Sequence, residues 1–196
     1  MVVTNSETIA NQVAELRNYG ASMAAWSRHT SSLFELPVYE QAGYNYKMTD
    51  IQASLGLVQM GKLEQMIAAR REIARFYDSQ LGELDWLQLP QESCGFTHVY
   101  QSYVCLINRI QGEPLQSSVE RRNRLWRHLA EHGIASVQGA QAMHTIHYYY
   151  QKYGWHPEDY PNAQRADLCS VALPIFPGLE QDDQERVIEA MQLFKP

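Results

Sequence analysis

The stretch "GYNYKMTDIQASLGLVQM" (residues 43–60) decides how the rest of the chain is interpreted. Two tyrosines, an asparagine and a lysine stand in it just before a strong helix start. Thr49 and Gln52 have the spacing of a capping box, in which each side chain bonds the other residue's backbone N–H. Asp50 suits the first turn of a helix. The stretch therefore predicts an extended segment over residues 43–47 that leads into a helix.

In an extended segment, successive side chains point to opposite sides. Asn45 and Lys47 would then face one way, and Tyr44 and Tyr46 the other. An amide and an ammonium beside the unpaired N–H groups of a helix N-terminus favour a bound anion, and phosphate is the first candidate. A surface turn whose tyrosines pack on the core explains the same residues. Spacing alone favours this second interpretation, because short motifs match often by chance.

Composition narrows the class of protein. The 196 residues, 45% of them hydrophobic, suffice for one large domain or for a domain plus a fragment. A net charge of −6 argues against a general binder of nucleic acids or anionic membranes. The three cysteines, Cys94, Cys105 and Cys169, form no CxxC pair, which is typical of reduced thiols. We see no signal peptide and no apolar run near the ~20 residues of a membrane helix, so we expect a cytoplasmic protein.

The order of elements predicts the fold class. A strand is expected at residues 1–4, a helix capped by Ser6 or Asn5, and a long helical region from Thr49 to Gly82. After Pro90, strands and helices alternate. The expected strands are at 98–107 and 134–138, with a strand-like segment at 173–176. The expected helices are at 117–133, 162–172 and 180–194. We therefore predict an α/β to α+β fold containing a small unit of about three strands plus helices.

Two further clusters are weaker signals. His144 and His147 are three residues apart and could meet one metal ion, but zinc needs more ligands than the sequence offers, so no metal site is predicted. The tyrosines that follow either line a polar cleft or pack half-buried. The run "RRNRLWR" (residues 121–127) is better explained as a solvated helix face than as a nucleic-acid surface, because Glu120 lies on the same helix and the chain is acidic.

The quoted stretch resembles one that the DegT/DnrJ/EryC1/StrS sugar aminotransferases carry as GYNYRMTDIQAALGLAQL. "LRNYGASMAAWSRH" (residues 16–29) is similar to their LRNHGMSRDAWKRY, and "MVVTNSE" (residues 1–7) to the end of GEGGMVVTNDE. Residues 133–179 are similar to a segment GI-x-T-x-x-G-T-H-A-V-H followed by YYR, PEDFPNA and SLPLYP. The similarity runs in order from residue 1 to about 194, so the chain is identified as a member of this family.

The resemblance implies an aspartate-aminotransferase type fold (fold type I). The family uses pyridoxal phosphate to move an amino group, usually from glutamate, to a keto nucleotide-sugar in polysaccharide or amino-sugar biosynthesis. Residues 1–60 would be the last part of the large cofactor-binding domain, 61–90 the connecting helix, and 91–196 the small C-terminal α+β domain with about three antiparallel strands plus helices. A homodimer is implied, with a nucleotide-sugar substrate and with neither nucleic acid nor membrane as partner.

The resemblance also assigns roles to residues. Asn45 would reach the cofactor phosphate of the neighbouring subunit. Lys47 stands where the family has an arginine, so the positive charge is kept and the bidentate fork is lost. His144 would line the nucleotide-sugar pocket, and Gln141 replaces a histidine that is usual there.

The family's Schiff-base lysine precedes the segment that resembles "MVVTNSE". None of the four lysines, at positions 47, 62, 152 and 195, lies in such a motif. We therefore expect no catalytic residue in these 196 residues, an inactive isolated chain and doubtful binding of the cofactor by this chain alone. The alternative is a non-catalytic remnant that assembles with itself or with a separately encoded N-terminal half. A nucleic-acid module is a weaker third hypothesis.

Overall fold

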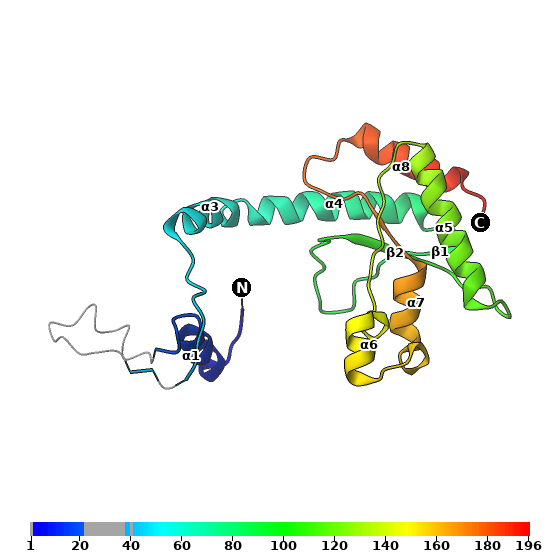
Figure 1. Cartoon of the computed structure of the whole chain (residues 1–196). Coiled ribbons are helices and arrows are strands. Elements are labelled where there is room, and N and C mark those ends of the chain that lie inside the picture. Colours follow the sequence, from blue (N-terminus) through cyan, green and yellow to red (C-terminus); the bar gives the residue numbers. More distant parts are fainter. Residues whose placement is uncertain (1, 22–37, 40) are drawn as a thin grey trace. The chain divides into compact units, whose positions relative to one another are not determined.

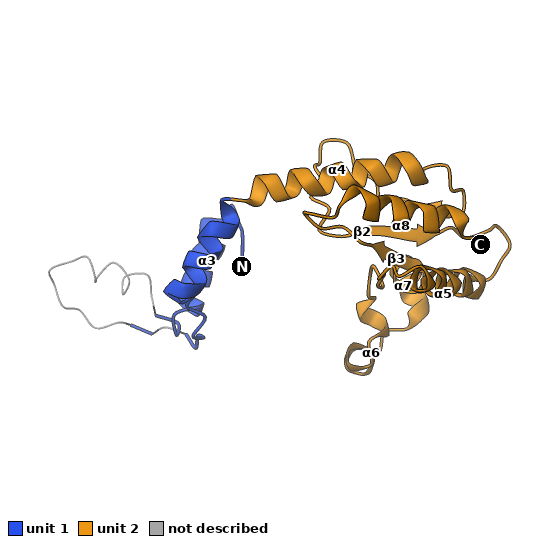
Figure 2. Ribbon diagram, turned by 90° about the horizontal axis from the view of Figure 1, so that it is seen from above, with its two compact units in different colours: residues 1–61 blue, residues 62–196 orange. Residues whose placement is uncertain are grey.

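A computed structural model describes residues 2–21, 38–39 and 41–196, in two compact units, residues 1–61 and 62–196 (Figure 2). We call them unit 1 and unit 2. No helix in the described ranges is long and apolar enough to cross a membrane.

Unit 1 contains two helices that begin at the predicted caps. Helix α1 (Glu7–Leu16) starts where the Ser6 hydroxyl accepts a bond from the N–H of Ile9, at 3.4 Å. Helix α3 (Asp50–Met60) starts at the capping box of Thr49 and Gln52, with both of its bonds present. The predicted strand at residues 1–4 is wrong for residues 2–4, since no described segment pairs with their backbone.

Unit 2 is built on a three-stranded antiparallel sheet in the order β1-β2-β3. The strands are β1 (Leu87–Gln88), β2 (Tyr103–Ile107) and β3 (Ser170–Leu173). Leu87 pairs with Ile107, and Tyr103 with Leu173. The predicted number and antiparallel arrangement of strands are confirmed. The short strand expected at 134–138 is wrong, since Val137 forms only an isolated bridge to Ala172, and β1 is the third strand instead.

Two strand boundaries differ from the prediction for physical reasons. The strand expected at 98–107 begins only at Tyr103, because Tyr100 adopts a φ of 45° and its N–H bonds the ring Nδ1 of His98. The strand expected at 173–176 instead covers 170–173. Pro174 has no N–H to continue the ladder.

Helices surround this sheet (Figure 1). Helix α4 (Leu63–Leu81) packs on α8 (Gln181–Leu193). Helix α5 (Leu115–Glu131) contacts α8 and the strands β2 and β3. Helix α7 (Pro161–Cys169) contacts α5 and also β2 and β3. Short elements η1 (Met143–Thr145), α6 (His147–Tyr153) and η2 (Pro157–Asp159) connect them. Helix α7 starts at Pro161, one residue before the predicted start at 162, because proline suits the first position of a helix.

The core of unit 2 lies between these helices and the sheet. Along β2, Tyr103, Cys105 and Ile107 are fully buried, and the residues between them are half-buried, as the two-residue period of a strand requires. The Tyr103 hydroxyl donates to Asp78 Oδ1 at 2.6 Å. Burial is the main reason that the pKa values of Tyr103 and of the Cys105 thiol are raised. These groups stay neutral inside the core.

Helix α5 contradicts part of the prediction for residues 121–127. Arg124 and Arg127 are exposed, but Arg121 and Arg122 are buried. The Arg122 guanidinium lies 4.0 Å from the centre of the Trp126 ring, and desolvation lowers its pKa. The long apolar stem of arginine allows such burial on a helix whose other face is charged. The helix face is therefore only half solvated.

Candidate functional site

The extended segment around Asn45 is held by the chain that follows α1. The Tyr44 N–H donates to the carbonyl of Leu16 at 2.6 Å, and the Tyr46 N–H donates to that of Arg17 at 3.0 Å. In return, the Tyr19 N–H donates to the carbonyl of Tyr44 at 2.9 Å. These bonds confirm the extended conformation that the sequence predicts for residues 44–46.

Two glycines allow the two segments to approach. Gly20 has a φ of 79°, a conformation that side chains rarely adopt. A Cβ atom on Gly43 would overlap the backbone of Gly20, and one on Gly20 would overlap the carbonyl of Gln41. The close approach therefore depends on glycine at both positions, and it fixes where Asn45 is presented.

The side chains of this segment alternate. The rings of Tyr44 and Tyr46 are parallel, with centroids 5.0 Å apart, and their exposed fractions of 57% and 72% show that they do not pack on a core formed by the described residues. The Asn45 amide is exposed and bonds no described residue. The Lys47 ammonium lies 4.3 Å from the centre of the Tyr19 ring, a cation–π contact that restrains it. An unpaired amide and a restrained cation thus lie two residues apart.

The N-terminus of α3 offers fewer unpaired N–H donors than the sequence predicts. The capping box uses the N–H of Thr49, which bonds Gln52 Oε1 at 3.0 Å, and the N–H of Gln52, which bonds Thr49 Oγ1 at 3.3 Å. Only the N–H groups of Asp50 and Ile51 remain without a partner among the described residues. The Asp50 carboxylate adds a negative charge in the same turn. Any anion here would depend mainly on Asn45 and Lys47.

This donor set fits a phosphate group. The amide of Asn45 donates two hydrogens and the ammonium of Lys47 three, and neither is committed to a carboxylate of the described chain. Bonds between a charged donor and a phosphate oxygen are among the strong ones in proteins. The residues therefore suit the phosphate of pyridoxal phosphate, the cofactor implied by the resemblance.

His144 belongs to unit 2, whereas Asn45 and Lys47 belong to unit 1. Its ring is 4% exposed, with Nε2 3.3 Å from the carbonyl oxygen of Pro157 and with the Tyr160 ring 5.1 Å away. A carbonyl oxygen only accepts, so Nε2 carries the proton in this contact and Nδ1 is left as an acceptor. The role of His144 in binding substrate stays a prediction.

Two polar residues that sequence reasoning missed hold the segment before His144. The Asp167 carboxylate, 9% exposed, accepts bonds from the Gln138 amide and, at 3.1 Å, from the Thr145 hydroxyl. Its two oxygens therefore tie both ends of the segment 138–145 to α7. A buried carboxylate needs such donors, because an unpaired one would be costly to desolvate.

The second missed residue is Ser170, which is fully buried at the start of β3. Its hydroxyl oxygen accepts the N–H groups of Gly139 at 3.1 Å and Ala140 at 3.0 Å. A Cβ atom on Gly139 would overlap the Val104 side chain. The only sequence signal for this role was a polar residue inside the apolar run "LCSVAL".

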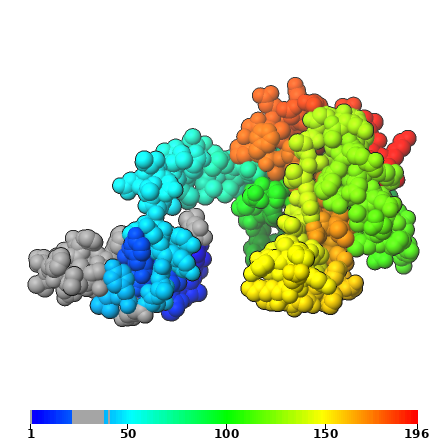
Figure 3. Space-filling view, in the orientation of Figure 1, coloured from blue at the N-terminus to red at the C-terminus, as the bar shows by residue number. Residues whose placement is uncertain are grey.

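The tyrosines after His144 form an aromatic cluster around α6, which protrudes as the yellow lobe of unit 2 in Figure 3. Tyr149 stacks on Tyr153 with ring centroids 6.2 Å apart, and Tyr153 on Trp155 at 4.6 Å. Tyr153 is 51% exposed. Among the described residues, no group of three or more His, Cys, Asp or Glu side chains could hold a metal ion.

The sequence of the chain matches that of a known protein family. Residues 1–192 match the DegT/DnrJ/EryC1/StrS aminotransferase family. The chain belongs to this family. The resemblance found in the sequence is thereby confirmed, and with it the relation to sugar aminotransferases, a family that uses pyridoxal phosphate.

Two curated relatives match the chain over almost its whole length. The chain is 31% identical over 192 residues to the uncharacterized protein MJ1066 of Methanocaldococcus jannaschii, covering 98% of this chain and 48% of that protein. It is 32% identical over 192 residues to the spore coat polysaccharide biosynthesis protein SpsC of Bacillus subtilis, with the same two coverages. The chain thus spans about half the length of the curated relatives it matches.

Solved structures show the fold. The aminotransferase from Psychrobacter cryohalolentis superposes with a TM-score of 0.80 at 23% identity, over 97% of this chain and 49% of that one. DesV from S. venezuelae gives a TM-score of 0.77 at 25% identity, over 97% and 45%. The chain is therefore a portion of the fold type I aminotransferase fold, with helices and a small three-stranded antiparallel sheet.

Proposed function

We propose that the chain is the portion of a pyridoxal phosphate-dependent aminotransferase that binds the cofactor phosphate and contacts the substrate. The whole enzyme would move an amino group, with glutamate as donor, to a keto nucleotide-sugar used in polysaccharide or amino-sugar biosynthesis. The single observation that carries the proposal is the Asn45 amide, which is exposed, held on a fixed extended segment and unpaired within the described chain.

Each residue has a defined task in this proposal. Asn45 donates to a phosphate oxygen of the cofactor held by a neighbouring copy, and Lys47 adds one positive charge. His144 contacts the substrate through Nδ1, the ring nitrogen left free by the contact with Pro157. When bound, pyridoxal phosphate supplies the electron sink on which the amino group is carried. The 196 residues by themselves are expected to be inactive, because none of their four lysines matches the family's lysine motif.

The experiment follows the Asn45 side-chain amide by NMR while pyridoxal 5′-phosphate is added to the isotope-labelled chain. Pyridoxal, which lacks the phosphate, is the matched control ligand. Because none of the lysines of this chain lies in the family's lysine motif, we expect only weak binding, seen as a saturable shift of the amide signal with pyridoxal phosphate and not with pyridoxal. The response should be at least tenfold weaker in Lys47→Gln. A pyridoxal response equal to that of the phosphorylated compound would refute phosphate recognition.

Inactivity is tested separately by borohydride trapping. The chain is incubated with pyridoxal phosphate, reduced and digested, and each lysine is searched for a pyridoxyl group by mass spectrometry. We expect only sparse labelling spread over the exposed lysines. Labelling of one lysine at close to one group per chain would contradict the proposed inactivity and identify a reactive amine.

A second candidate function is an assembly module, and helix α3 favours it. Ile51, Leu55, Leu57 and Val58 are between 56% and 83% exposed, and α3 buries no residue at all. Several large apolar side chains exposed on one helix are normally covered by a partner. In this proposal a second copy of the chain covers α3, which gives a homodimer.

Sedimentation velocity tests this second function. We expect a concentration-dependent dimer for the chain and a monomer for Leu57→Glu, whose buried charge would oppose association. Glu64→Gln, on the charged start of α4, serves as the control and should leave the dimer intact. A monomer at every concentration would exclude the assembly function.

A further inference from the structure

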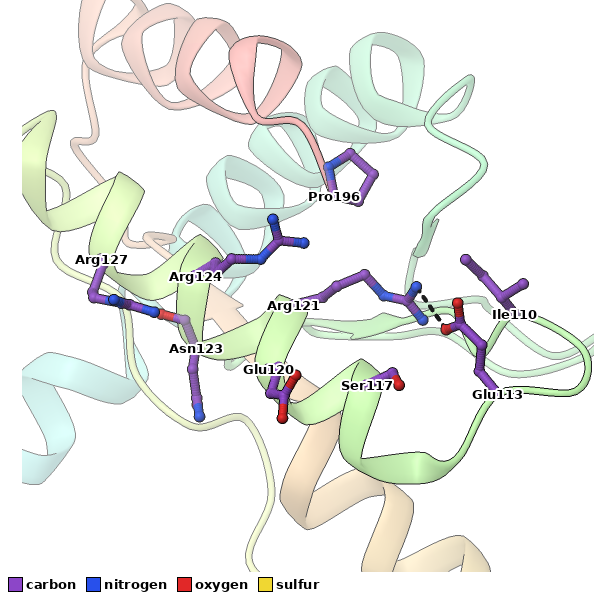
Figure 4. Close-up of a pocket in the computed structure, with 9 residues that line it drawn as sticks. All are labelled: Ile110, Glu113, Ser117, Glu120, Arg121, Asn123, Arg124, Arg127 and Pro196. Atoms are coloured by element: carbon purple, nitrogen blue, oxygen red, sulfur yellow. Dashed lines mark hydrogen bonds and ion pairs between the residues drawn. The ribbon is translucent and has the colours of Figure 1, made fainter.

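A groove runs along α5 in unit 2, on a part of the fold with no assigned role. Its walls are α5, the loop before it and the C-terminal residues that follow α8, and its volume is about 670 Å³ (Figure 4). Sites for small molecules usually measure roughly 300–1,000 Å³. None of the three predicted site residues, Asn45, Lys47 and His144, lines it.

Three arginines line the groove, at positions 121, 124 and 127. Residues three apart lie on one face of a helix. In Figure 4, the Arg124 side chain extends towards Pro196 and the Arg121 side chain towards Glu113. Glu120 and Asn123 also line the groove, and their side chains extend from α5 in another direction. The Glu120 carboxylate is therefore not interposed between these two guanidinium groups.

Arg121 forms a fixed wall of the groove. It is 8% exposed, its Nη1 lies 3.0 Å from Glu113 Oε2, and its Nη2 donates to the carbonyl of Asn108 at 3.2 Å. The contact with Glu113 is an ion pair whose geometry falls short of a hydrogen bond. The buried Nε–H of Arg121 has no acceptor in the described chain. A bound anion near Arg121 would stabilise its buried Nε–H, which otherwise lacks a hydrogen-bond acceptor.

Arg124 is the free cation of the groove. Its guanidinium is exposed, lies 6.0 Å from the Phe194 ring centre, and forms no ion pair or hydrogen bond with any described residue. Arg127 makes only a 3.4 Å bond from Nε to the carbonyl of Asn123. By contrast, the exposed Arg186 is paired with Asp183 at 2.9 Å. Two positive charges at the groove are therefore not matched by a carboxylate within ion-pair distance.

We propose that this groove binds the phosphate group of a small phosphorylated molecule. Arg124 would donate two parallel N–H bonds to the phosphate oxygens, Arg127 would add charge at the rim, and Arg121 would add positive potential from the wall. A guanidinium matches phosphate geometry bidentately, which an ammonium does not. A nucleic-acid backbone is disfavoured, because Arg122 is buried and the chain carries a net charge of −6.

Inorganic pyrophosphate is the probe. The ¹⁵N-labelled chain is titrated with it while the arginine Nε–Hε signals are followed by NMR, and sodium chloride of equal ionic strength is the reference. We expect a saturable shift centred on Arg124 and its neighbours. Arg124→Gln should weaken binding about tenfold or more, which is the loss expected for one charge-assisted pair.

Arg186→Gln is the matched control, since it removes an exposed arginine of the same unit that is already paired. The arginine Nε–Hε signals of this variant should respond to pyrophosphate like those of the unaltered chain. Equal binding by Arg124→Gln, or shifts reproduced by sodium chloride, would overturn the proposal. Tighter binding of a single-stranded oligonucleotide than of pyrophosphate would also overturn it, in favour of a nucleic-acid surface.

Discussion

The two units of the chain differ in what stabilises them. Unit 2 has a continuous apolar core in which Tyr77, Leu81 and Leu129 are fully buried. In unit 1, the only buried residues of the described ranges are Gly20 and Ala21, and neither α1 nor α3 buries a residue. Local capping starts the helices of unit 1, whereas long-range packing holds unit 2. We infer that unit 2 is the independently stable part and that unit 1 gains most from a covering partner.

The largest effect is expected from a cavity in the core of unit 2. Leu129→Ala should lower the free energy of unfolding by about 2–5 kcal/mol, since a fully buried leucine loses its contacts and leaves a void. Leu57→Ala on α3, where the side chain is 74% exposed, should change it by no more than about 0.5 kcal/mol at concentrations at which the chain is monomeric. Urea denaturation of the two variants measures both. Equal losses would remove the contrast between the units.

Tyr103→Phe probes the buried hydroxyl of β2. Its bond to Asp78 is lost, so the free energy of unfolding should fall by about 1–3 kcal/mol at neutral pH. The variant should also change the pH dependence. Because the folded pKa of Tyr103 is raised, its contribution is full below the unfolded value near 10 and is lost as the pH rises above it.

Denaturation midpoints between pH 9 and pH 11.5 test this linkage. The unaltered chain should lose stability steadily above about pH 10, and Tyr103→Phe should lose it more shallowly. Tyr148→Phe, which alters a 60% exposed tyrosine, is the control and should follow the unaltered chain. Parallel curves for all three proteins would show that the buried phenol does not govern alkaline unfolding.

Ser170→Ala tests how the segment around Gly139 and Ala140 is held in unit 2. Two amide donors, those of Gly139 and Ala140, would lose their acceptor, at an expected cost of about 1–2 kcal/mol. Hydrogen exchange of these two amides should become at least tenfold faster, while amides in α4 keep their rates. Unchanged exchange at both positions would show that Ser170 does not hold the segment that carries His144.

The smallest effect concerns unit 1. Thr49→Ala removes the cap of α3 and should weaken that helix by about 1 kcal/mol, because the N–H of Gln52 loses its acceptor. Backbone chemical shifts of residues 50–54 report the fraying directly. Thr49→Ser keeps the hydroxyl and should behave like the unaltered chain. Full helicity in Thr49→Ala would mean that α3 is held by packing rather than by its cap.

How much of the structure can be predicted from the sequence depends on how many positions along the chain separate the interacting residues. Ser6 and the capping box of Thr49 and Gln52 act over three residues, so both helix starts were predicted correctly. The extended segment around Asn45 also follows from local alternation. Strand β1 was missed, because two residues give no period, and the start of β2 depends on a side chain of His98 that bends the backbone.

The remaining features arise from contacts between distant residues. Asp167 meets Gln138 across 29 positions, and Ser170 meets Gly139 across 31, so neither pairing is visible as a motif. The burial of Arg121 depends in the same way on a carboxylate in the preceding loop. Local signals therefore indicated where Asn45 and Lys47 would be presented, and tertiary packing determined how His144 is held.

The order in which unit 2 can assemble follows from Arg70. One of its nitrogens, Nη1, bonds the carbonyls of Tyr100 and Gln101 and also that of Ile175, which lies 105 positions further along the chain. Strand β2 likewise has no neighbour on one side until β3 has been synthesised. Both β3 and Ile175 must therefore have left the ribosome before this unit closes. We expect slow folding of this unit, because its contacts join distant positions.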